Sequence, residues 1–360
     1  MIPGLVNAHT HLELTRLNGR ISKFSSFTDW LSQLIEERRS WTPEEYLASA
    51  GEGARESLAS GTTLVGDISA SGLSWRALKA ARLRKIIFEE MIALSPAKLG
   101  ESLARLHGRL AAVEQDELLR SGVSPHAPYT VSPELYRSMA ELAREKGMLV
   151  TSHVAETRDE LRFLEYGTGE FSDFLIGLEA LPADWIPPAL PPVAYLEKLG
   201  VLRNLLLIHG NYLDAESISM IFKSHSSVVY CPRSSAFFGH ENHPVRQLLD
   251  MGVTVALGTD SLASNESLSI LDEMRFLARL RKDLRSEEIF RLATLNGAAA
   301  LGFRGRLGRL RRGHWADMTV LELPESTRAR NLTEQILEGA GECIGTVVQG
   351  EVAWSRLERV

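Results

Sequence analysis

The feature that most constrains the fold is a repeated alternation of short apolar runs with helical segments. Eight runs rich in apolar and β-branched residues end in polar side chains, and they cover residues 5–11, 62–68, 85–92, 122–128, 149–156, 205–213, 228–235 and 253–261. Short runs of this kind are typical of parallel strands that are buried on both faces. The sequence therefore predicts eight parallel strands.

Segments with helical periodicity separate these runs. Residues 43–60 begin after Thr42 with a proline and two glutamates, which is typical of a capped helix start. Residues 132–147, 243–252 and 268–280 show the same periodicity. Strands that alternate with helices in this way predict an α/β fold, and eight of them predict a (β/α)8 TIM barrel.

The pattern changes after the last helical segment, residues 286–303. Residues 304–323 and 343–354 look like two short β-segments with turns, not like another strand–helix unit. We therefore expect a catalytic barrel over residues 1–303. Residues 304–360 are expected to form the C-terminal β-segment of a small composite β-domain beside it.

Charge and composition exclude several classes of protein. The 360 residues carry 40 basic and 46 acidic side chains, a formal net charge of −6, so a nucleic-acid-binding surface is not expected. The sequence contains no run of about 18 apolar residues, the length needed to span a membrane, and its first residues do not resemble a signal peptide. The two cysteines cannot form a disulfide framework. We expect a cytoplasmic protein that binds neither nucleic acid nor membrane.

Metal-ligating side chains gather at the ends of the predicted strands. They are His9, His11, His126, His153, His209 and Asp260. In a TIM barrel the carboxyl ends of all strands meet at one mouth, so these residues are expected to converge. Asp260 alone could equally cap a helix, and a single histidine is weak evidence. Together, several imidazoles and a carboxylate predict a site for Zn²⁺, with Fe²⁺ as the alternative.

The order of these motifs resembles the amidohydrolase superfamily. The chain carries HTH after an apolar run, then SHVAE, LIHG and LGTDSLASN. The resemblance lies with the branch of aminohydrolases and chlorohydrolases, and it extends from Pro3 to the C-terminal β-segments. It implies a TIM barrel of the metal-dependent hydrolase type. It also implies that one divalent metal is bound by His9, His11, His153 and Asp260.

Two departures from the family pattern accompany this resemblance. Dinuclear members carry a bridging carboxylated lysine on the fourth strand, where this chain has His126 and no lysine, so a single metal is implied. Relatives usually carry several β-strands before the first barrel strand. We expect those N-terminal strands to be missing here, because the first metal ligand is already residue 9.

The resemblance also implies catalytic roles. His209 corresponds to the family histidine that orients the attacking hydroxide or polarises the attacked carbon, and Asp260 is placed to accept a proton from water. Glu156 follows His153 by three residues and can carry protons to a ring nitrogen and to departing ammonia. The alternative for Glu156 is a solvated position at the start of the next helix.

Three further residues are expected to contact substrate. His126 would hydrogen-bond it, with a packed polar residue between two prolines as the alternative. Trp30 belongs to an apolar stripe at helical spacing, which is typical of packing, but the family places this region beside the substrate pocket, where Trp30 would stack on a base. Arg233 follows the seventh strand, where a loop that recognises a ribose or a side chain is expected.

These observations predict a metal-dependent hydrolytic deaminase of an aminated purine nucleoside. The segments HTHLELT, FTDW, SPHAPYT and TDSLASNESLSILDEMR resemble aminodeoxyfutalosine deaminases, so conversion of 6-amino-6-deoxyfutalosine to futalosine in menaquinone biosynthesis is the first expectation. The alternatives are a deaminase of S-adenosylhomocysteine, methylthioadenosine or adenosine, then an s-triazine chlorohydrolase. Outside the enzymes, a non-catalytic metal-binding barrel is the alternative. The resemblance further suggests a small-molecule substrate and a homodimer.

Overall fold

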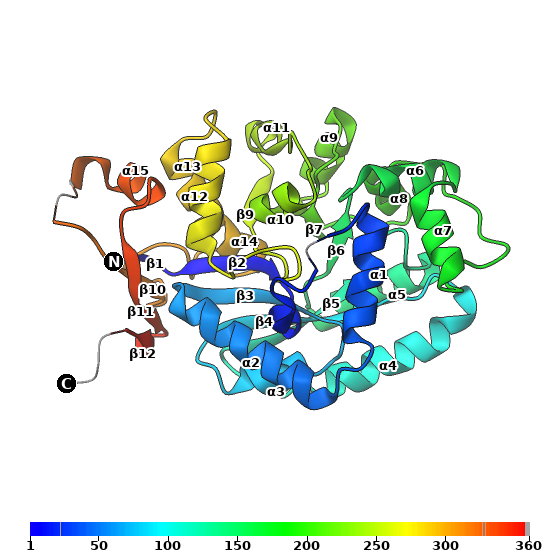
Figure 1. The fold of residues 1–360 in the computed structure, drawn as a ribbon, viewed down its shortest axis with the longest axis horizontal. Coiled ribbons are helices and arrows are strands. Elements are labelled where there is room, and N and C mark those ends of the chain that lie inside the picture. Colours follow the sequence, from blue (N-terminus) through cyan, green and yellow to red (C-terminus); the bar gives the residue numbers. More distant parts are fainter. Residues whose placement is uncertain (22, 326, 328, 357–360) are drawn as a thin grey trace.

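Eight parallel strands form the centre of the molecule (Figure 1). The structure is a computed structural model, and it describes residues 1–21, 23–325, 327 and 329–356. The strands are β2 (Leu5–Thr10), β3 (Thr62–Ser69), β4 (Arg84–Met91), β5 (Leu119–Pro125), β6 (Thr151–Val154), β7 (Leu206–His209), β8 (Ser227–Tyr230) and β9 (Thr254–Leu257). They pair in two parallel sheets, β2–β3–β4–β5 and β6–β7–β8–β9. Bridges from Val123 to Val150 and from Thr10 to Asp260 join the sheets on both sides, and the predicted (β/α)8 barrel is confirmed.

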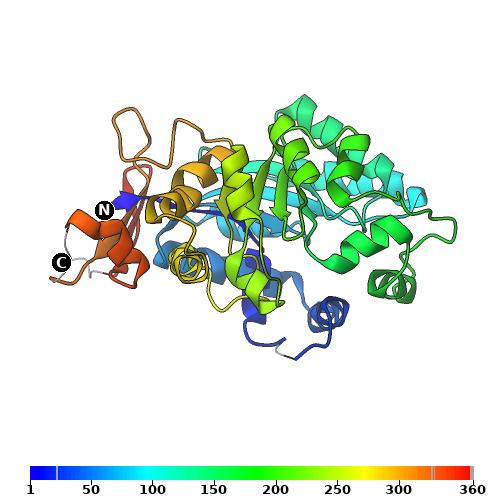
Figure 2. The same cartoon turned by 90° about the horizontal axis from the view of Figure 1, so that it is seen from above.

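Helices connect the strands and surround them in the two perpendicular views (Figures 1 and 2). They are α1 (Phe27–Arg38), α2 (Pro43–Ala59), α3 (Ser74–Lys79), α4 (Leu99–Ala112), α5 (Pro133–Lys146), α6 (Arg158–Tyr166), α7 (Glu170–Gly177), α8 (Pro192–Lys198), α9 (Ala215–Lys223), α10 (Pro232–Phe237), α11 (Val245–Met251), α12 (Ile270–Leu280), α13 (Ser286–Arg291), α14 (Gly297–Ala300) and α15 (Leu332–Leu337). A π-helical segment, Leu292–Asn296, joins α13 to α14. The expected start of α2 is present as a capping box between Thr42 and Glu45.

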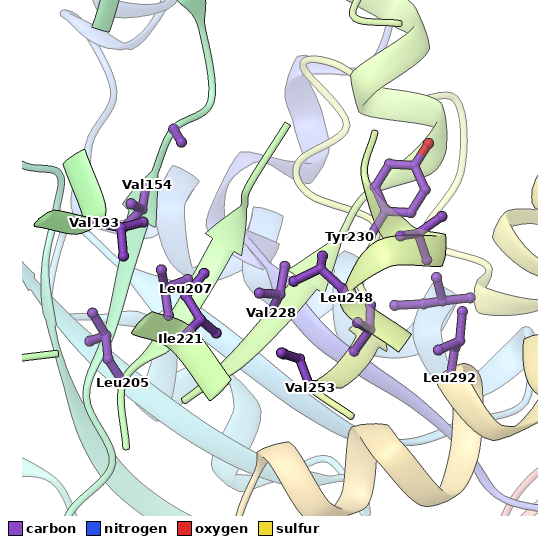
Figure 3. Close-up of a cluster of buried hydrophobic side chains, with 14 of the residues drawn as sticks. Val154, Val193, Leu205, Leu207, Ile221, Val228, Tyr230, Leu248, Val253 and Leu292 are labelled. Atoms are coloured by element: carbon purple, nitrogen blue, oxygen red, sulfur yellow. The ribbon is translucent and has the colours of Figure 1, made fainter. Parts of the chain in front are cut away.

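Strand side chains pack in two layers because successive residues point to opposite faces of a strand. Leu207 and Val228 join a large cluster with Ile221 of α9 and Leu248 of α11 (Figure 3). Their chain neighbours, among them Ile208 of β7, belong to a second buried cluster with Val6, Phe88 and Ala256 from other strands. Each buried aliphatic side chain contributes about 1.5–3 kcal/mol. This packing fixes the strand ends that carry the polar residues.

A small antiparallel sheet lies beside the barrel, and Figure 1 shows the N-terminus next to it. Its order is β1–β10–β11–β12, from β1 (Ile2–Pro3), β10 (Met318–Glu322), β11 (Glu342–Val348) and β12 (Glu351–Ser355). β1 pairs with β10, so a two-residue strand is present before the barrel, where no N-terminal strand was expected. The β-structure predicted over 304–323 begins only at Met318, and residues 304–317 form an irregular loop. The division into two domains at residue 303 stays a prediction.

A buried ion pair joins this sheet to the barrel. Arg84, the first residue of β4, contacts Asp317 through Nε–Oδ2 and Nη2–Oδ1 distances of 2.6 and 3.2 Å. Both side chains are 2% exposed. The Arg84 guanidinium also lies 4.3 Å from the ring centre of Trp315.

Among the described residues, no helix is long and apolar enough to cross a membrane.

Candidate metal centre and active site

Four histidines meet at the carboxyl ends of three strands. His9 lies in β2 and His11 follows it directly, while His153 lies in β6 and His209 ends β7. The ring centres of His9 lie 4.9, 5.1 and 5.7 Å from those of His11, His153 and His209. The predicted convergence of these residues is therefore seen in the structure, over sequence separations of up to 200 residues.

Asp260 completes this cluster from the loop after β9. Its Oδ1 atom lies 3.5 Å from Nε2 of His9 and 3.6 Å from Nε2 of His11. Its Oδ2 accepts hydrogen bonds from the hydroxyls of Ser234 and Ser264 at 2.7 and 3.1 Å. Burial would raise the pKa of Asp260, but His9 and the other nearby histidines hold that pKa well below its usual value. Asp260 is therefore a fixed carboxylate.

Burial favours the neutral form of three of these imidazoles, which is the form that binds metal ions. Burial, and then His9, lower the pKa of His11 well below its usual value and that of His153 to about 4. Burial likewise lowers the pKa of His209 well below its usual value. Nδ1 of His153 lies 3.0 Å from the carbonyl oxygen of His126, which can only accept a hydrogen bond. This contact places the proton on Nδ1 and leaves Nε2 of His153 free to act as a ligand.

The arrangement fits a divalent cation. Ring nitrogens of His9, His11 and His153 lie within 4.8 Å of one another, as do ligand atoms of Glu156, His209 and Asp260. His9 is completely buried, and neither of its ring nitrogens has a hydrogen-bond partner. Buried polar atoms are rarely left without a partner, so the ring nitrogens of His9 fit a role as ligands of a metal cation. Imidazole nitrogens with one carboxylate suit Zn²⁺ or Fe²⁺.

Glu156 enters the site just after β6. Its Oε1 atom lies 3.3 Å from Nε2 of His209, and its side chain is buried. Burial, followed by the nearby carboxylates of Asp260 and Glu160, raises the pKa of Glu156 well above its usual value. Burial therefore favours the protonated form of Glu156, whose carboxyl group lies within 4.8 Å of a ligand atom of Asp260.

The backbone at Glu156 is fixed by a second acidic residue. The carboxylate of Glu160, in α6, accepts hydrogen bonds from the backbone N–H groups of Ala155 and Glu156 at 2.9 and 2.8 Å. Ala155 has φ +53°, a left-handed conformation that L-residues adopt only under constraint. The side chain of Asn211 donates to the carbonyl of Glu156 at 3.0 Å. The orientation of Glu156 is therefore set by three hydrogen bonds.

His126 lies on the edge of this cluster, and its contact with substrate stays a prediction. Its ring centre is 4.9 Å from that of His153, and its Nδ1 lies 2.7 Å from the hydroxyl of Thr130. Burial lowers the pKa of His126 well below its usual value. Ligand atoms of His126, His153 and Glu90 also lie within 4.8 Å of one another.

Sequence reasoning gave no role to Glu90. It lies in β4, is buried, and leaves Oε1 without a hydrogen-bond partner, and burial raises its pKa to about 8. The available signal was the pair of glutamates at the end of the run over residues 85–92, which resembles the polar endings of the other strands. The serines that hold Asp260 were also missed, because nothing in their spacing marks them.

The structure does not bring Trp30 and Arg233 into the cluster. Trp30 is 6% exposed, donates its Nε1–H to the carbonyl of Ala263, and packs edge-on against Phe238 at 4.9 Å. Arg233 contacts Ser267 and Glu266 through its guanidinium. These contacts are those of packed and surface residues, and the substrate-binding role of Trp30 and Arg233 stays a prediction.

Comparisons with known proteins agree with this geometry. The family model described as the amidohydrolase family matches residues 1–353. The chain is 29% identical over 361 residues to a 5-methylthioadenosine/S-adenosylhomocysteine deaminase of Halothermothrix orenii, covering 96% of this chain and 79% of that one. An adenosine deaminase structure from Xanthomonas campestris with bound zinc has a TM-score of 0.86 and 27% identity, over 100% of this chain and 81% of that one. The aminofutalosine deaminase of Helicobacter pylori in complex with methylthio-coformycin has a TM-score of 0.85 and 25% identity, over 97% of this chain and 86% of that one.

Proposed function

The chain belongs to the amidohydrolase family and is a hydrolase that acts on carbon–nitrogen bonds; from this premise we propose that it removes the amino group of an adenosine-type nucleoside as ammonia. The observation that carries the proposal is the position of two buried carboxyl groups beside the histidine cluster. Ligand atoms of Glu156, His209 and Asp260 lie within 4.8 Å of one another, and the pKa of Glu156 is raised whereas that of Asp260 is lowered. Hydrolytic deamination needs one group that accepts a proton and one that donates it.

The amidohydrolase family is metal-dependent, and we propose that His9, His11, His153 and Asp260 hold one divalent cation. The buried ring nitrogens of His9 without partners support this assignment. When bound, the cation would lower the pKa of a water molecule toward neutrality and so supply a nucleophile. Zn²⁺ is our first choice and Fe²⁺ the alternative, because imidazole binds both and the Xanthomonas structure contains zinc.

The remaining roles fall to side chains of the site. Asp260 accepts a proton as water attacks the carbon that carries the amino group. Glu156 donates its proton to the adjacent ring nitrogen, and the proton on Asp260 is passed to the amino group, which leaves as ammonia; the second proton of the water returns to Glu156 as the carbonyl forms. His209, 3.3 Å from Glu156, orients the attacking water toward the ring. His126 is proposed to hydrogen-bond the substrate.

For the substrate, we propose 5-methylthioadenosine or S-adenosylhomocysteine ahead of other adenosine derivatives. The relatives in Halothermothrix orenii and Pyrococcus abyssi carry this name, and the second is 32% identical over 349 residues. The sequence motifs favour 6-amino-6-deoxyfutalosine, but the names of these relatives give better support to the alternative, S-adenosylhomocysteine or methylthioadenosine. A role in menaquinone biosynthesis remains the second candidate, supported by the likeness to the Helicobacter pylori enzyme. A cytoplasmic location and a homodimer also remain proposals.

A substrate panel tests this function. The purified protein, with its metal content measured, is incubated with 5-methylthioadenosine, S-adenosylhomocysteine, adenosine and 6-amino-6-deoxyfutalosine, and released ammonia is quantified. We expect the highest kcat/KM for one of the first two. The variant Glu156→Gln should lower kcat by about 10²–10⁴-fold and retain the metal, because the amide cannot transfer the proton.

Glu165→Gln provides a matched control for this variant. Glu165 lies on the exposed face of α6, the helix that follows Glu156. The control variant therefore makes the same glutamate-to-glutamine change outside the site. It should leave kcat unchanged. Ammonia release that Glu156→Gln does not reduce, or no release from any member of the panel, would contradict the proposed deaminase.

A further inference from the structure

A cavity lies at the opposite end of the barrel from the histidine cluster. Its volume is about 660 Å³, and Val253 and Thr254 at the start of β9 form part of its wall. Asp260 follows the other end of the same strand. We call this space the arginine cavity, because its wall includes Arg246, Arg285, Arg291, Arg304, Arg309 and Arg311. These arginines have no part in the proposed deamination.

The charges of the arginine cavity are unbalanced. Arg246 pairs with Asp250 and Glu288 at 2.8 and 3.1 Å, and Arg285 pairs with Glu288 at 3.3 Å. Glu288 is the one acidic residue among the described residues that line the cavity. In the described part of the chain, the other four arginine side chains have no ion pair or hydrogen bond, and they are Arg291, Arg304, Arg309 and Arg311. Four positive charges therefore face one volume without a counter-charge.

The loop that carries three of these arginines, residues 304–317, is held firmly against the barrel. Gly308 has φ +83°, and a Cβ atom there would lie only 2.6 Å from Cα of Leu295 in the π-helical segment. Leu307 beside it is 3% exposed. The backbone N–H of Trp315 donates to the carbonyl of Arg306 at 2.9 Å. The backbone that carries the arginines is therefore docked, which reduces the loop entropy lost on binding a ligand.

Two more features of the wall indicate a binding site. The π-helical segment Leu292–Asn296 supplies Leu292, Leu295 and Asn296 to the cavity, and such π-helical turns occur frequently at functional sites. His314 also lines the cavity, and its Nδ1 is buried without a hydrogen-bond partner. A polar atom in that state is expected to have a ligand or water to bond with.

We propose that the arginine cavity binds a polyphosphate anion, either inorganic triphosphate or the phosphate chain of a nucleotide. Guanidinium groups donate two parallel hydrogen bonds to phosphate oxygens, and several such groups match a ligand with several negative charges. The cavity volume lies within the range of about 300–1,000 Å³ that is usual for small-molecule sites. A long nucleic acid would need an extended basic surface, which the net charge of −6 makes unfavourable.

Isothermal titration calorimetry on the full chain tests this site. Inorganic triphosphate and UTP are titrated at about 0.1 M salt. UTP carries no amino-purine ring, so the proposed catalytic site should not retain it. We expect one equivalent to bind, and the triple variant Arg304→Gln, Arg309→Gln and Arg311→Gln to weaken binding by about tenfold or more. UTP that binds more tightly than triphosphate identifies a nucleotide site, and equal affinities identify a site for the phosphate chain alone.

A second triple variant controls for overall charge. Arg105→Gln, Arg137→Gln and Arg144→Gln remove the same charge from exposed positions on α4 and α5 and should leave triphosphate affinity unchanged. Gly308→Ala should weaken binding while circular dichroism shows a folded protein, because the added methyl group displaces the loop. The proposal is overturned if neither anion binds, if both triple variants weaken binding equally, or if a single-stranded RNA binds more tightly than triphosphate and displaces it.

Discussion

The two ends of the barrel handle charge in opposite ways. At the carboxyl end, the carboxyl and imidazole groups are buried and face one another; burial raises the pKa of Glu156 and lowers that of His209, whereas the nearby histidines hold the pKa of Asp260 low. At the amino end, Arg304, Arg309 and Arg311 are exposed around a cavity and lack partners in the described part of the chain. Buried titratable groups suit proton-transfer chemistry, since water does not screen their charges. Exposed groups without partners suit reversible binding of an anion.

The largest effect expected from this difference is the loss of all ammonia release when metal is removed. Dialysis against a chelator should abolish turnover, and one equivalent of Zn²⁺ or Fe²⁺ should restore it, because the proposed nucleophile depends on the cation. The arginine cavity has no carboxylate or imidazole cluster of this kind, so triphosphate binding should survive the same treatment. Turnover that persists in protein shown to be metal-free would remove the basis of the proposed centre at the carboxyl end.

A second prediction concerns an arginine that lies at the amino end but is buried. Arg84→Gln leaves the carboxylate of Asp317 buried without its partner, and breaking such a pair costs about 3–5 kcal/mol of unfolding free energy. Urea unfolding measures this loss. The exposed Arg309→Gln should change the unfolding free energy by less than about 0.5 kcal/mol. Equal effects of the two variants would show that burial does not separate structural from ligand-binding arginines here.

The sequence predicts those features of the two ends that local patterns carry, and it does not predict those that contacts between distant residues determine. Eight strands were predictable because each run is short and rich in apolar residues, and the ligand histidines because they end those runs. The roles of Glu90, Ser234 and Ser264 were not, since each follows from neighbours that are distant in sequence. Residues 304–317 resemble a β-segment in composition, but their path is set by the contact of Gly308 with Leu295, which no local pattern reveals.

A third prediction tests how the buried end keeps its geometry. Glu160→Gln replaces a carboxylate that accepts from two backbone N–H groups with an amide that has only one acceptor atom. We expect kcat to fall by about tenfold while KM and metal content stay the same, because Glu156 shifts relative to the ring. A fall in kcat together with a loss of metal would instead assign Glu160 a general role in stability, and an unchanged kcat would show that Asn211 alone holds Glu156.

The smallest effect is expected from salt, and it separates the two ends without a mutation. Raising the ionic strength from about 0.1 to 1 M shortens the screening length from about 10 to 3 Å. Triphosphate binding by the exposed arginines should weaken severalfold, which calorimetry measures. Turnover of 5-methylthioadenosine, which is uncharged, should change by less than about twofold, because His9 is completely buried and Asp260 nearly so. If turnover fell in parallel with triphosphate binding, the two ends would be coupled, and the arginine cavity would influence the rate of deamination.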